Sequence, residues 1–236
     1  MRDVRALFFD VGGTIFDWKS TAKERIEEYA AHTNSRIDAN AFAEDWRSEM
    51  FKIHGRVRVG DLPWMNADAM HLKALDTLIS DYPLLEHIDR SELVRSTWHA
   101  LKTFPGAAEA VERLRSRYTV IVLTILSWES IVQSSKAGGV QWDGILSCEF
   151  LSYYKPSLQA YLRAAGLLGL EPAEAMMVAA HAGDVSAAQA AGLRTALVSV
   201  PEKDVVSEGF GVRGEESFDI EARDFEELCS RLGVSA

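Results

Sequence analysis

The chain has 236 residues, 47% of them hydrophobic and 25% charged, and a formal net charge of −10. That is enough to bury a substantial core, either as one domain with a large insertion or as two small domains. The acidic balance argues against nucleic acid as the main partner, because phosphate backbones are bound by clustered Lys and Arg, but a small anionic substrate stays open.

The first predicted element is a buried strand over residues 5–10, where a short apolar run ends in Asp10. A turn over residues 11–14 follows, with two glycines and a threonine. The next segment carries apolar residues at helical spacing after Ser20, which we expect to be the N-cap of that helix.

Only helical patterns are found from there to about residue 102. Helices are predicted over residues 41–53, 67–79 and 91–101, separated by Gly60, Pro63 and Pro83. We therefore expect a helical domain over residues 18–102, inserted into an α/β core domain formed by residues 1–17 and 103–236.

Strands and helices alternate after residue 102. Strands are predicted over 118–123, 145–150, 175–180 and 195–200, and helices over 106–117, 127–137, 156–168 and from about Asp184 to Gly192. This alternation predicts a Rossmann-like α/β fold, a parallel sheet with helices on both faces. The acidic, Gly-rich segment from 205 to 216 is predicted to be a mobile loop.

Residues with reactive side chains follow the predicted strands. In open parallel sheets, ligands bind beyond the carboxyl ends of the strands. The residues just past those ends are Asp10, Thr124, Lys155, His181 and Asp184. The sequence therefore predicts a site where two carboxylates, a cation, a hydroxyl and an imidazole meet.

Four segments, in this order, resemble the motifs of the haloacid dehalogenase superfamily. They are Phe-Phe-Asp-Val-Gly-Gly-Thr around Asp10, Val-Ile-Val-Leu-Thr ending at Thr124, Tyr-Tyr-Lys-Pro around Lys155, and Ala-Ala-His-Ala-Gly-Asp ending at Asp184. One such motif is weak evidence, but all four in order span nearly the whole chain.

The resemblance is closest to the type II branch, the L-2-haloacid dehalogenases. Segments around Trp18, Arg47, Trp64 and Trp98 resemble parts of that branch, which extends the match into the helical insertion. The insertion is then expected to be a cap domain over the active site. The resemblance implies a hydrolase that needs no cofactor.

The chemistry that this resemblance implies begins with Asp10. A positioned, partly desolvated carboxylate is a competent nucleophile. We expect Asp10 to attack C2 of a 2-haloacid, displace halide and form an ester, which water then cleaves at the Asp10 carbonyl. Attack from the back of the carbon–halogen bond inverts the carbon.

The other motif residues are expected to support Asp10. Lys155 would keep the carboxylate ionised and stabilise negative charge during ester cleavage. Asp184 would hold Lys155 and orient water, and Thr14 and Thr124 would offer hydroxyl groups to the carboxylates.

Three residues outside the motif cores complete the expected site. Arg47 matches the arginine with which dehalogenases engage the leaving halide, because a guanidinium stays charged and presents several donors. Tyr161 matches a further active-site position of the family, and Trp64 is a candidate for an apolar wall.

The sequence departs from the dehalogenase pattern at three positions. Gly12 stands where phosphatases carry an Asp general acid, whose loss costs about 10²–10⁴-fold, and where dehalogenases carry an aromatic residue. We expect Gly12 to enlarge the pocket. Ile125 replaces an Asn, so substrate carboxylate binding falls to backbone N–H groups, whereas His181 replaces an Asn and keeps a polar role.

Two alternatives stay open at this point. The first is a phosphoester or phosphonate hydrolase whose Mg²⁺ is held by Asp10, the Gly12 carbonyl and Asp184. The second is a degenerate member that binds a metabolite without turnover.

The expected partners and location follow from composition. Cys148 and Cys229 lie far apart, which favours a reduced cytoplasmic protein. No apolar run reaches the roughly 18 residues of a membrane span. Because the first predicted strand starts within the first five residues, we expect no signal peptide. We expect a monomer or homodimer that acts on a small anionic substrate, with no nucleic acid and no membrane partner.

Overall fold

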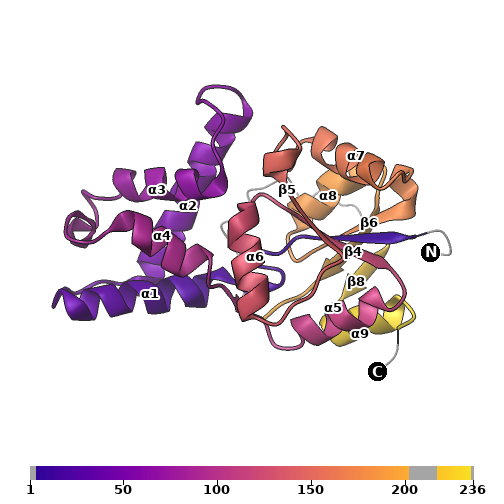
Figure 1. Ribbon diagram of the computed structural model, residues 1–236, viewed down its shortest axis with the longest axis horizontal. Helices are drawn as coiled ribbons and strands as arrows, with labels where there is room; N and C mark the ends of the chain where they lie inside the picture. Colours follow the sequence, from indigo (N-terminus) through magenta and orange to yellow (C-terminus); the bar gives the residue numbers. More distant parts are fainter. Residues whose placement is uncertain (1–3, 202–216, 235–236) are drawn as a thin grey trace.

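Six parallel strands form the sheet in the computed structural model, which describes residues 4–201 and 217–234 (Figure 1). Their order across the sheet is β5-β4-β1-β6-β7-β8. The strands are β1 (Ala6–Phe9), β4 (Thr119–Thr124), β5 (Gly144–Ser147), β6 (Ala175–Ala179), β7 (Arg194–Val198) and β8 (Ile220–Ala222). The predicted Rossmann-like α/β fold class is confirmed.

The central strand β1 is apolar throughout because both of its faces are covered. All four of its residues are fully buried, and Phe8 lies in register with Ile121 on one side and Met177 on the other. A strand covered on both faces reads as a continuous hydrophobic run. The helices that accompany the sheet are α5 (Ala107–Arg115), α6 (Trp128–Ala137), α7 (Leu158–Leu167), α8 (Ala182–Ala190) and α9 (Phe225–Arg231).

A second unit, the helical lobe, lies beside the sheet and its helices, which together form the sheet lobe (Figure 1). The helical lobe consists of α1 (Trp18–His32), α2 (Ala39–Arg58), α3 (Ala67–Thr77) and α4 (Arg90–Trp98). The chain enters and leaves it through the antiparallel pair β2 (Phe16–Asp17) and β3 (Lys102–Thr103). The chain also forms short 3₁₀ helices at Pro83–Glu86, Cys148–Phe150 and Pro172–Glu174.

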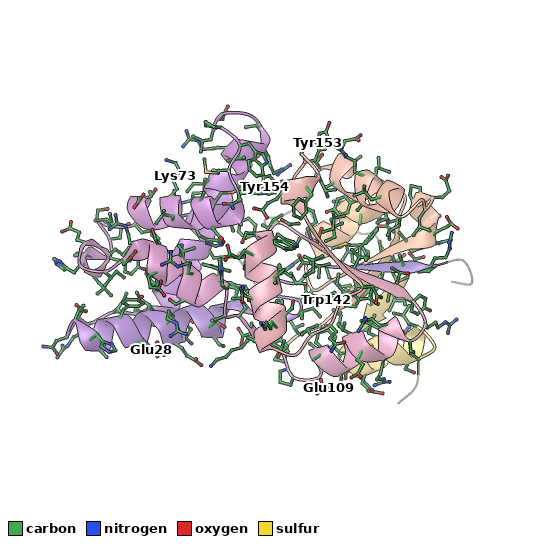
Figure 2. All side chains as sticks on the ribbon, viewed as in Figure 1. Glu28, Lys73, Glu109, Trp142, Tyr153 and Tyr154 are labelled. Atoms are coloured by element: carbon green, nitrogen blue, oxygen red, sulfur yellow. The ribbon has the colours of Figure 1, made fainter. Side chains whose placement is uncertain are left out.

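Apolar side chains fill the space between the helices and the sheet, while charged residues such as Glu28, Lys73 and Glu109 project outward (Figure 2). Within the described residues, no helix has both the length and the apolar character needed to cross a membrane. Cys148 and Cys229 are both buried as free thiols.

Several predicted boundaries were wrong because local hydrogen bonds decide where elements begin. Asp17, and not Ser20, is the N-cap of α1, since its side chain accepts a hydrogen bond from the Ser20 amide at 3.0 Å. The helix predicted from Pro156 begins at Leu158, and the strand predicted over 145–150 turns into a 3₁₀ helix after Ser147.

Some elements carried no usable sequence signal. Strands β2 and β3 have two residues each, too few for an alternating pattern, and β8 and α9 near the C-terminus were not predicted. The loop predicted over residues 205–216 lies outside the described residues.

Replacing Asp17 tests the junction between the two lobes. We expect Asp17→Ala to lower the free energy of unfolding by about 1 kcal/mol, because the first turn of α1 loses its side-chain acceptor. Urea unfolding followed by circular dichroism measures this change. Asp17→Asn keeps an acceptor oxygen and should stay within a few tenths of a kcal/mol, roughly the difference between good caps; equal losses for both variants would contradict the capping role.

Candidate active site

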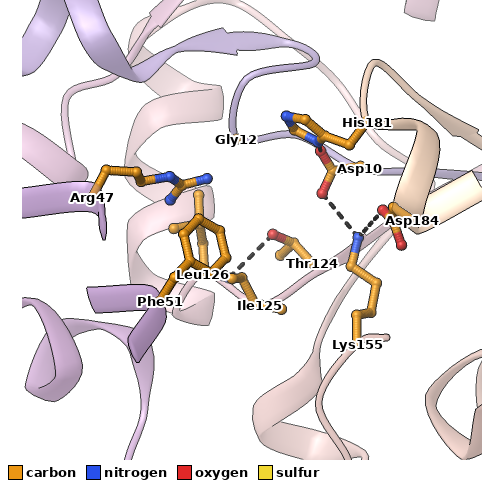
Figure 3. Close-up of a pocket in the computed structure, with 10 residues that line it drawn as sticks. All are labelled: Asp10, Gly12, Arg47, Phe51, Thr124, Ile125, Leu126, Lys155, His181 and Asp184. Atoms are coloured by element: carbon orange, nitrogen blue, oxygen red, sulfur yellow. Dashed lines mark hydrogen bonds and ion pairs between the residues drawn. The ribbon is translucent and has the colours of Figure 1, made fainter. Parts of the chain in front are cut away.

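A pocket lies beyond the carboxyl ends of β1, β4 and β6, where the helical lobe faces the sheet (Figure 3). Residues of the sheet lobe form one side of it, and two residues of α2 form the other. The lining consists of Asp10, Gly12, Arg47, Phe51, Thr124, Ile125, Leu126, Lys155, His181 and Asp184. Most of the residues singled out in the sequence therefore meet in one place.

Lys155 is the link between the two carboxylates. Its Nζ donates to Asp10 Oδ1 at 2.9 Å and to Asp184 Oδ2 at 2.6 Å. The lysine residue is only 1% exposed, so its charge depends on these carboxylates for compensation. Removing water from three charges is costly, and their mutual attraction and hydrogen bonds must offset that cost.

The second oxygen of Asp10 is held by a hydroxyl and an imidazole. Thr14 Oγ1 donates to Asp10 Oδ2 at 2.8 Å and itself accepts the Ala180 amide at 2.9 Å. His181 Nδ1 lies 3.1 Å from the same Oδ2. Because an ionised carboxylate only accepts, Nδ1 must carry a hydrogen while Asp10 is charged.

These contacts set the charge of Asp10. Burial by itself raises the pKa of this carboxyl, but the Lys155 ammonium and the hydrogen bond from His181 outweigh it and hold the pKa well below its ordinary value. Asp10 is therefore ionised at neutral pH even though it is 6% exposed. An ionised, desolvated carboxylate is suited to nucleophilic attack.

Asp184 lies in the first turn of α8 and differs from Asp10 in its surroundings. Its Oδ1 accepts the Tyr161 hydroxyl at 2.5 Å, and its Oδ2 accepts Lys155. Burial raises the pKa of Asp184, and the nearby charge of Asp10 adds to that rise. Tyr161 donates to Asp184 and is absent from the pocket lining, so it acts on the pocket only through that carboxylate.

Arg47 brings a positive charge to the opposite side of the pocket. It is 2% exposed, and its guanidinium carbon lies 5.0 Å from the Trp18 ring centre, 4.6 Å from that of Phe51 and 5.5 Å from that of Trp98. Aromatic faces attract a cation at such distances. Figure 3 shows the guanidinium directed from α2 toward the pocket, where it can receive an anion.

Gly12 does not enlarge the pocket as expected. A Cβ atom at this position would lie 3.2 Å from Leu126 Cδ1 and 3.8 Å from Arg47 Nη2, so Leu126 occupies the space that a side chain would take. The cavity offers about 20 Å³ to the centre of a water molecule. That is enough for roughly one buried water.

Thr124 and Ile125 lie in the loop after β4. The Thr124 hydroxyl accepts the Leu126 amide at 3.1 Å, which fixes the loop and leaves its hydrogen able to donate. Ile125 is 7% exposed and adds an apolar surface to the lining.

Trp64 lies away from this pocket. It is 54% exposed and stacks on Tyr154 with ring centres 6.2 Å apart. Phe51 and Leu126 line the pocket but were missed in the sequence. Phe51 follows Arg47 by four residues on α2, so helical periodicity places both on one face and offered a signal.

The two side-chain ligands expected for Mg²⁺, Asp10 and Asp184, are engaged by other groups. Both oxygens of Asp184 are engaged by Lys155 and Tyr161, and an ammonium lies between the two carboxylates. Within residues 4–201 and 217–234, no group of three or more His, Cys, Asp or Glu side chains is arranged to hold a metal ion.

Comparison with known proteins points to one family. The family model for haloacid dehalogenase-like hydrolases matches residues 4–192. The chain is 28% identical over 201 residues to (S)-2-haloacid dehalogenase 4A from Burkholderia cepacia, covering 83% of each chain.

Two solved structures are similar over almost their full length. A defluorinating L-2-haloacid dehalogenase has 31% identity and a TM-score of 0.87, with 97% of this chain and 95% of that chain covered. A second L-2-haloacid dehalogenase has 28% identity and a TM-score of 0.84, with 98% of this chain and 100% of that chain covered.

Lys155→Met tests the charge balance of the site. With its cation gone, buried Asp10 should titrate above its ordinary pKa, and the unfolding free energy at pH 7 should fall by about 3–5 kcal/mol. A carboxyl whose pKa is raised in the folded state lowers the free energy of unfolding at a pH above that pKa. This loss disappears as the pH falls below 3.8, the pKa of the carboxyl in the unfolded chain. The deficit should therefore shrink between pH 7 and pH 4.

Urea unfolding across this pH range measures the deficit, with Lys136→Met on the exposed side of α6 as the matched control. A deficit that stays constant with pH would show that Lys155 contributes packing and not charge compensation.

Proposed function

Since the chain belongs to the family of haloacid dehalogenase-like hydrolases, we propose that it hydrolyses the carbon–halogen bond of a short 2-haloacid. The observation that carries the proposal is the pairing of a buried, ionised Asp10 with Lys155 on one side of a small pocket and Arg47 on the other. The dehalogenase names of the similar proteins support the same reaction.

In the first step, an oxygen of Asp10 forms a bond to C2 of the substrate while the carbon–halogen bond breaks. The halide leaves with the bonding electrons toward Arg47, whose guanidinium is held among aromatic rings on the far side of the pocket. Attack and departure on opposite sides of C2 fit an inversion of that carbon. The product of this step is an ester on Asp10.

In the second step, water adds to the carbonyl carbon of the Asp10 ester. Lys155, Thr14 and His181 donate to the Asp10 oxygens and would stabilise the negative charge that develops there. Asp184, whose pKa is raised, orients the water and takes its proton. The acyl C–O bond then breaks, and a 2-hydroxyacid leaves with the proton that Asp184 returns to its oxygen. The second proton of the water stays on the Asp10 carboxyl and is lost to solvent, which restores the ionised carboxylate.

The pocket walls favour a short substrate. Phe51, Ile125 and Leu126 provide apolar surface, and the space that Gly12 leaves is taken by Leu126. A haloacetate carries only hydrogen atoms at C2 besides the halogen and needs the least room. Its carboxylate would be bound by backbone N–H groups of the loop after β4, because Ile125 offers no polar side chain.

The helical lobe would act as a cap. We assign residues 18–102 to the cap and residues 1–17 and 103–236 to the core, since Arg47 and Phe51 reach the pocket from α2. Two buried free thiols fit a reducing cytoplasm, where the protein would work as a monomer or homodimer without a required cofactor.

Asp10→Ala tests the nucleophile. We expect it to abolish halide release from chloroacetate, fluoroacetate and L-2-chloropropionate, because among the described residues no other group lining the pocket combines a low pKa with access to C2. Halide release by the unaltered protein should persist in EDTA, and Asp61→Ala, at an exposed acid, should retain it. Full turnover by Asp10→Ala, or EDTA-sensitive release of phosphate from a phosphoester panel, would contradict the proposal.

Leu126→Ala tests the size limit. The variant should raise the kcat/KM ratio of 2-chloropropionate to chloroacetate by about 10-fold or more, since one methyl group in an apolar pocket is worth about 10–200-fold. Steady-state halide assays provide the ratio. Leu167→Ala, at a position 67% exposed, is the control. An unchanged ratio for Leu126→Ala would place the size limit elsewhere.

A further inference from the structure

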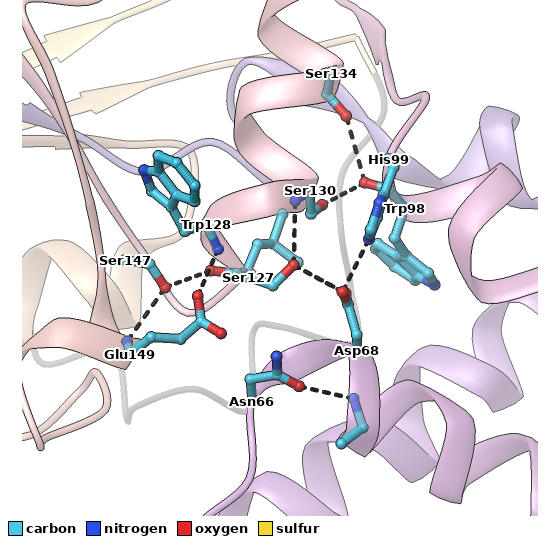
Figure 4. Close-up of polar contacts among 12 residues, drawn as sticks. Asn66, Asp68, Trp98, His99, Ser127, Trp128, Ser130, Ser134, Ser147 and Glu149 are labelled. Atoms are coloured by element: carbon cyan, nitrogen blue, oxygen red, sulfur yellow. Dashed lines mark hydrogen bonds and ion pairs between the residues drawn. The ribbon is translucent and has the colours of Figure 1, made fainter. Parts of the chain in front are cut away.

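Asp68, in the first turn of α3, contacts both lobes at once (Figure 4). Ser127 Oγ of the sheet lobe lies 3.0 Å from each carboxylate oxygen of Asp68. His99 Nε2, at the end of α4, lies 2.9 Å from Asp68 Oδ2. We call this set of three side chains the Asp68 bridge.

Ser127 connects the bridge to the pocket. It directly follows the lining residues Thr124, Ile125 and Leu126. Its hydroxyl donates a hydrogen bond to Asp68 and also accepts one from the Ser130 amide at 3.2 Å. Ser127 is therefore the N-cap of α6. A displacement of Asp68 therefore acts directly on the loop that forms one wall of the pocket.

The other contacts along α6 hold the chain where it leaves the helical lobe. The Trp98 carbonyl accepts the hydroxyls of Ser130 and Ser134, and the Leu101 amide donates to Ser134 Oγ at 3.1 Å. These hydrogen bonds lie where the chain crosses from the helical lobe to the sheet lobe, and the covalent connection limits movement there. Asp68 lies more than 30 residues before that crossing, so its contact with Ser127 depends on how the lobes are oriented.

The pocket requires such an orientation to change. Its walls come from both lobes, and about 20 Å³ is open to the centre of a water molecule. A haloacid has several non-hydrogen atoms and exceeds the room of roughly one water. Parting of the lobes would give a haloacid the room to reach Asp10, and their present arrangement places Arg47 across the pocket from Asp10.

We propose that Asp68 is a positioning residue, which holds the helical lobe closed through Ser127 so that Arg47 faces Asp10 during carbon–halogen cleavage. The inference rests on the proposed function and adds a residue outside the pocket to it. It assigns to His99 the task of orienting the Asp68 carboxylate from within the helical lobe.

The chemistry of the bridge suits a contact that must form and break. A carboxylate that accepts hydrogen bonds from a hydroxyl and an imidazole is held more strongly than a neutral acceptor. The Asp68 side chain is 25% exposed, so water can replace Ser127 when the lobes part. The hydrogen bond to Asp68 outweighs burial and raises the pKa of His99, which keeps its Nε2 hydrogen in place for donation.

Amide hydrogen exchange on the free protein tests the contact without any substrate. Asp68→Ala should speed exchange by about 5-fold or more at the start of both α3 and α6, including the Ser130 amide. Asn66→Ala, which removes the N-cap of α3 but keeps Asp68, is the matched control and should speed exchange in α3 alone. Equal exchange in α6 for Asp68→Ala and the unaltered protein would overturn the inference.

Single-turnover halide release from chloroacetate tests the positioning role. Asp68→Ala should slow it by about 3–10-fold, whereas Asp68→Asn, which keeps an acceptor oxygen for Ser127, should stay within about 2-fold of the unaltered protein. Asp68→Ala should add no further loss in a Ser127→Ala background, because the two residues act through one contact. The inference would be overturned by equal losses for Asp68→Ala and Asp68→Asn, or by additive losses in the double variant. It would also be overturned if exchange in α6 became faster while halide release stayed unchanged.

The two readouts separate this inference from the proposed function. If no haloacid is hydrolysed by the unaltered protein, the proposed function fails while exchange in α6 still decides whether Asp68 holds the lobes together. If Asp68→Ala does not fold, Ser127→Ala removes the other side of the same contact, and its exchange in α3 should rise. Unchanged exchange in α3 would then overturn the inference.

Discussion

The site depends on one buried ion pair network, in which the Lys155 ammonium lies between Asp10 and Asp184. Its members come from the end of β1, the loop before α7 and the first turn of α8, and Lys155 and Asp10 are 145 positions apart in the chain. Because all three groups are almost completely removed from water, each charge is tolerated only in the presence of the others. This mutual dependence gives Asp10 a low pKa and leaves Asp184 with a raised one.

The pocket around this network is built from two lobes with different tasks. The sheet lobe places the charged groups after β1, in the loop before α7 and in the first turn of α8. The helical lobe supplies Arg47, whose charge is stabilised by aromatic rings and directed toward the pocket. Asp68 and Ser127 join the two lobes next to the loop after β4, which links closure of the lobes to the pocket wall.

The departures from the dehalogenase pattern have a common structural result. Gly12 leaves room that Leu126 takes, and Ile125 adds a further apolar surface, so the pocket is small. His181 keeps a polar contact with Asp10 through Nδ1. The charged groups are therefore retained, while the part of the pocket that receives the substrate differs from the dehalogenase pattern. These differences bear on substrate size more than on reaction type.

The amino-acid sequence alone determined the α/β fold class, the helical insertion and the edge of the sheet at which Asp10, Thr124, Lys155, His181 and Asp184 meet, because hydrophobic periodicity and the strand-end rule are local or topological. Only the tertiary structure decided that Leu126 fills the space beside Gly12, that Trp64 lies outside the pocket and that Asp68 reaches Ser127. These features depend on how side chains from distant segments pack against one another, and no pattern within one segment encodes that packing.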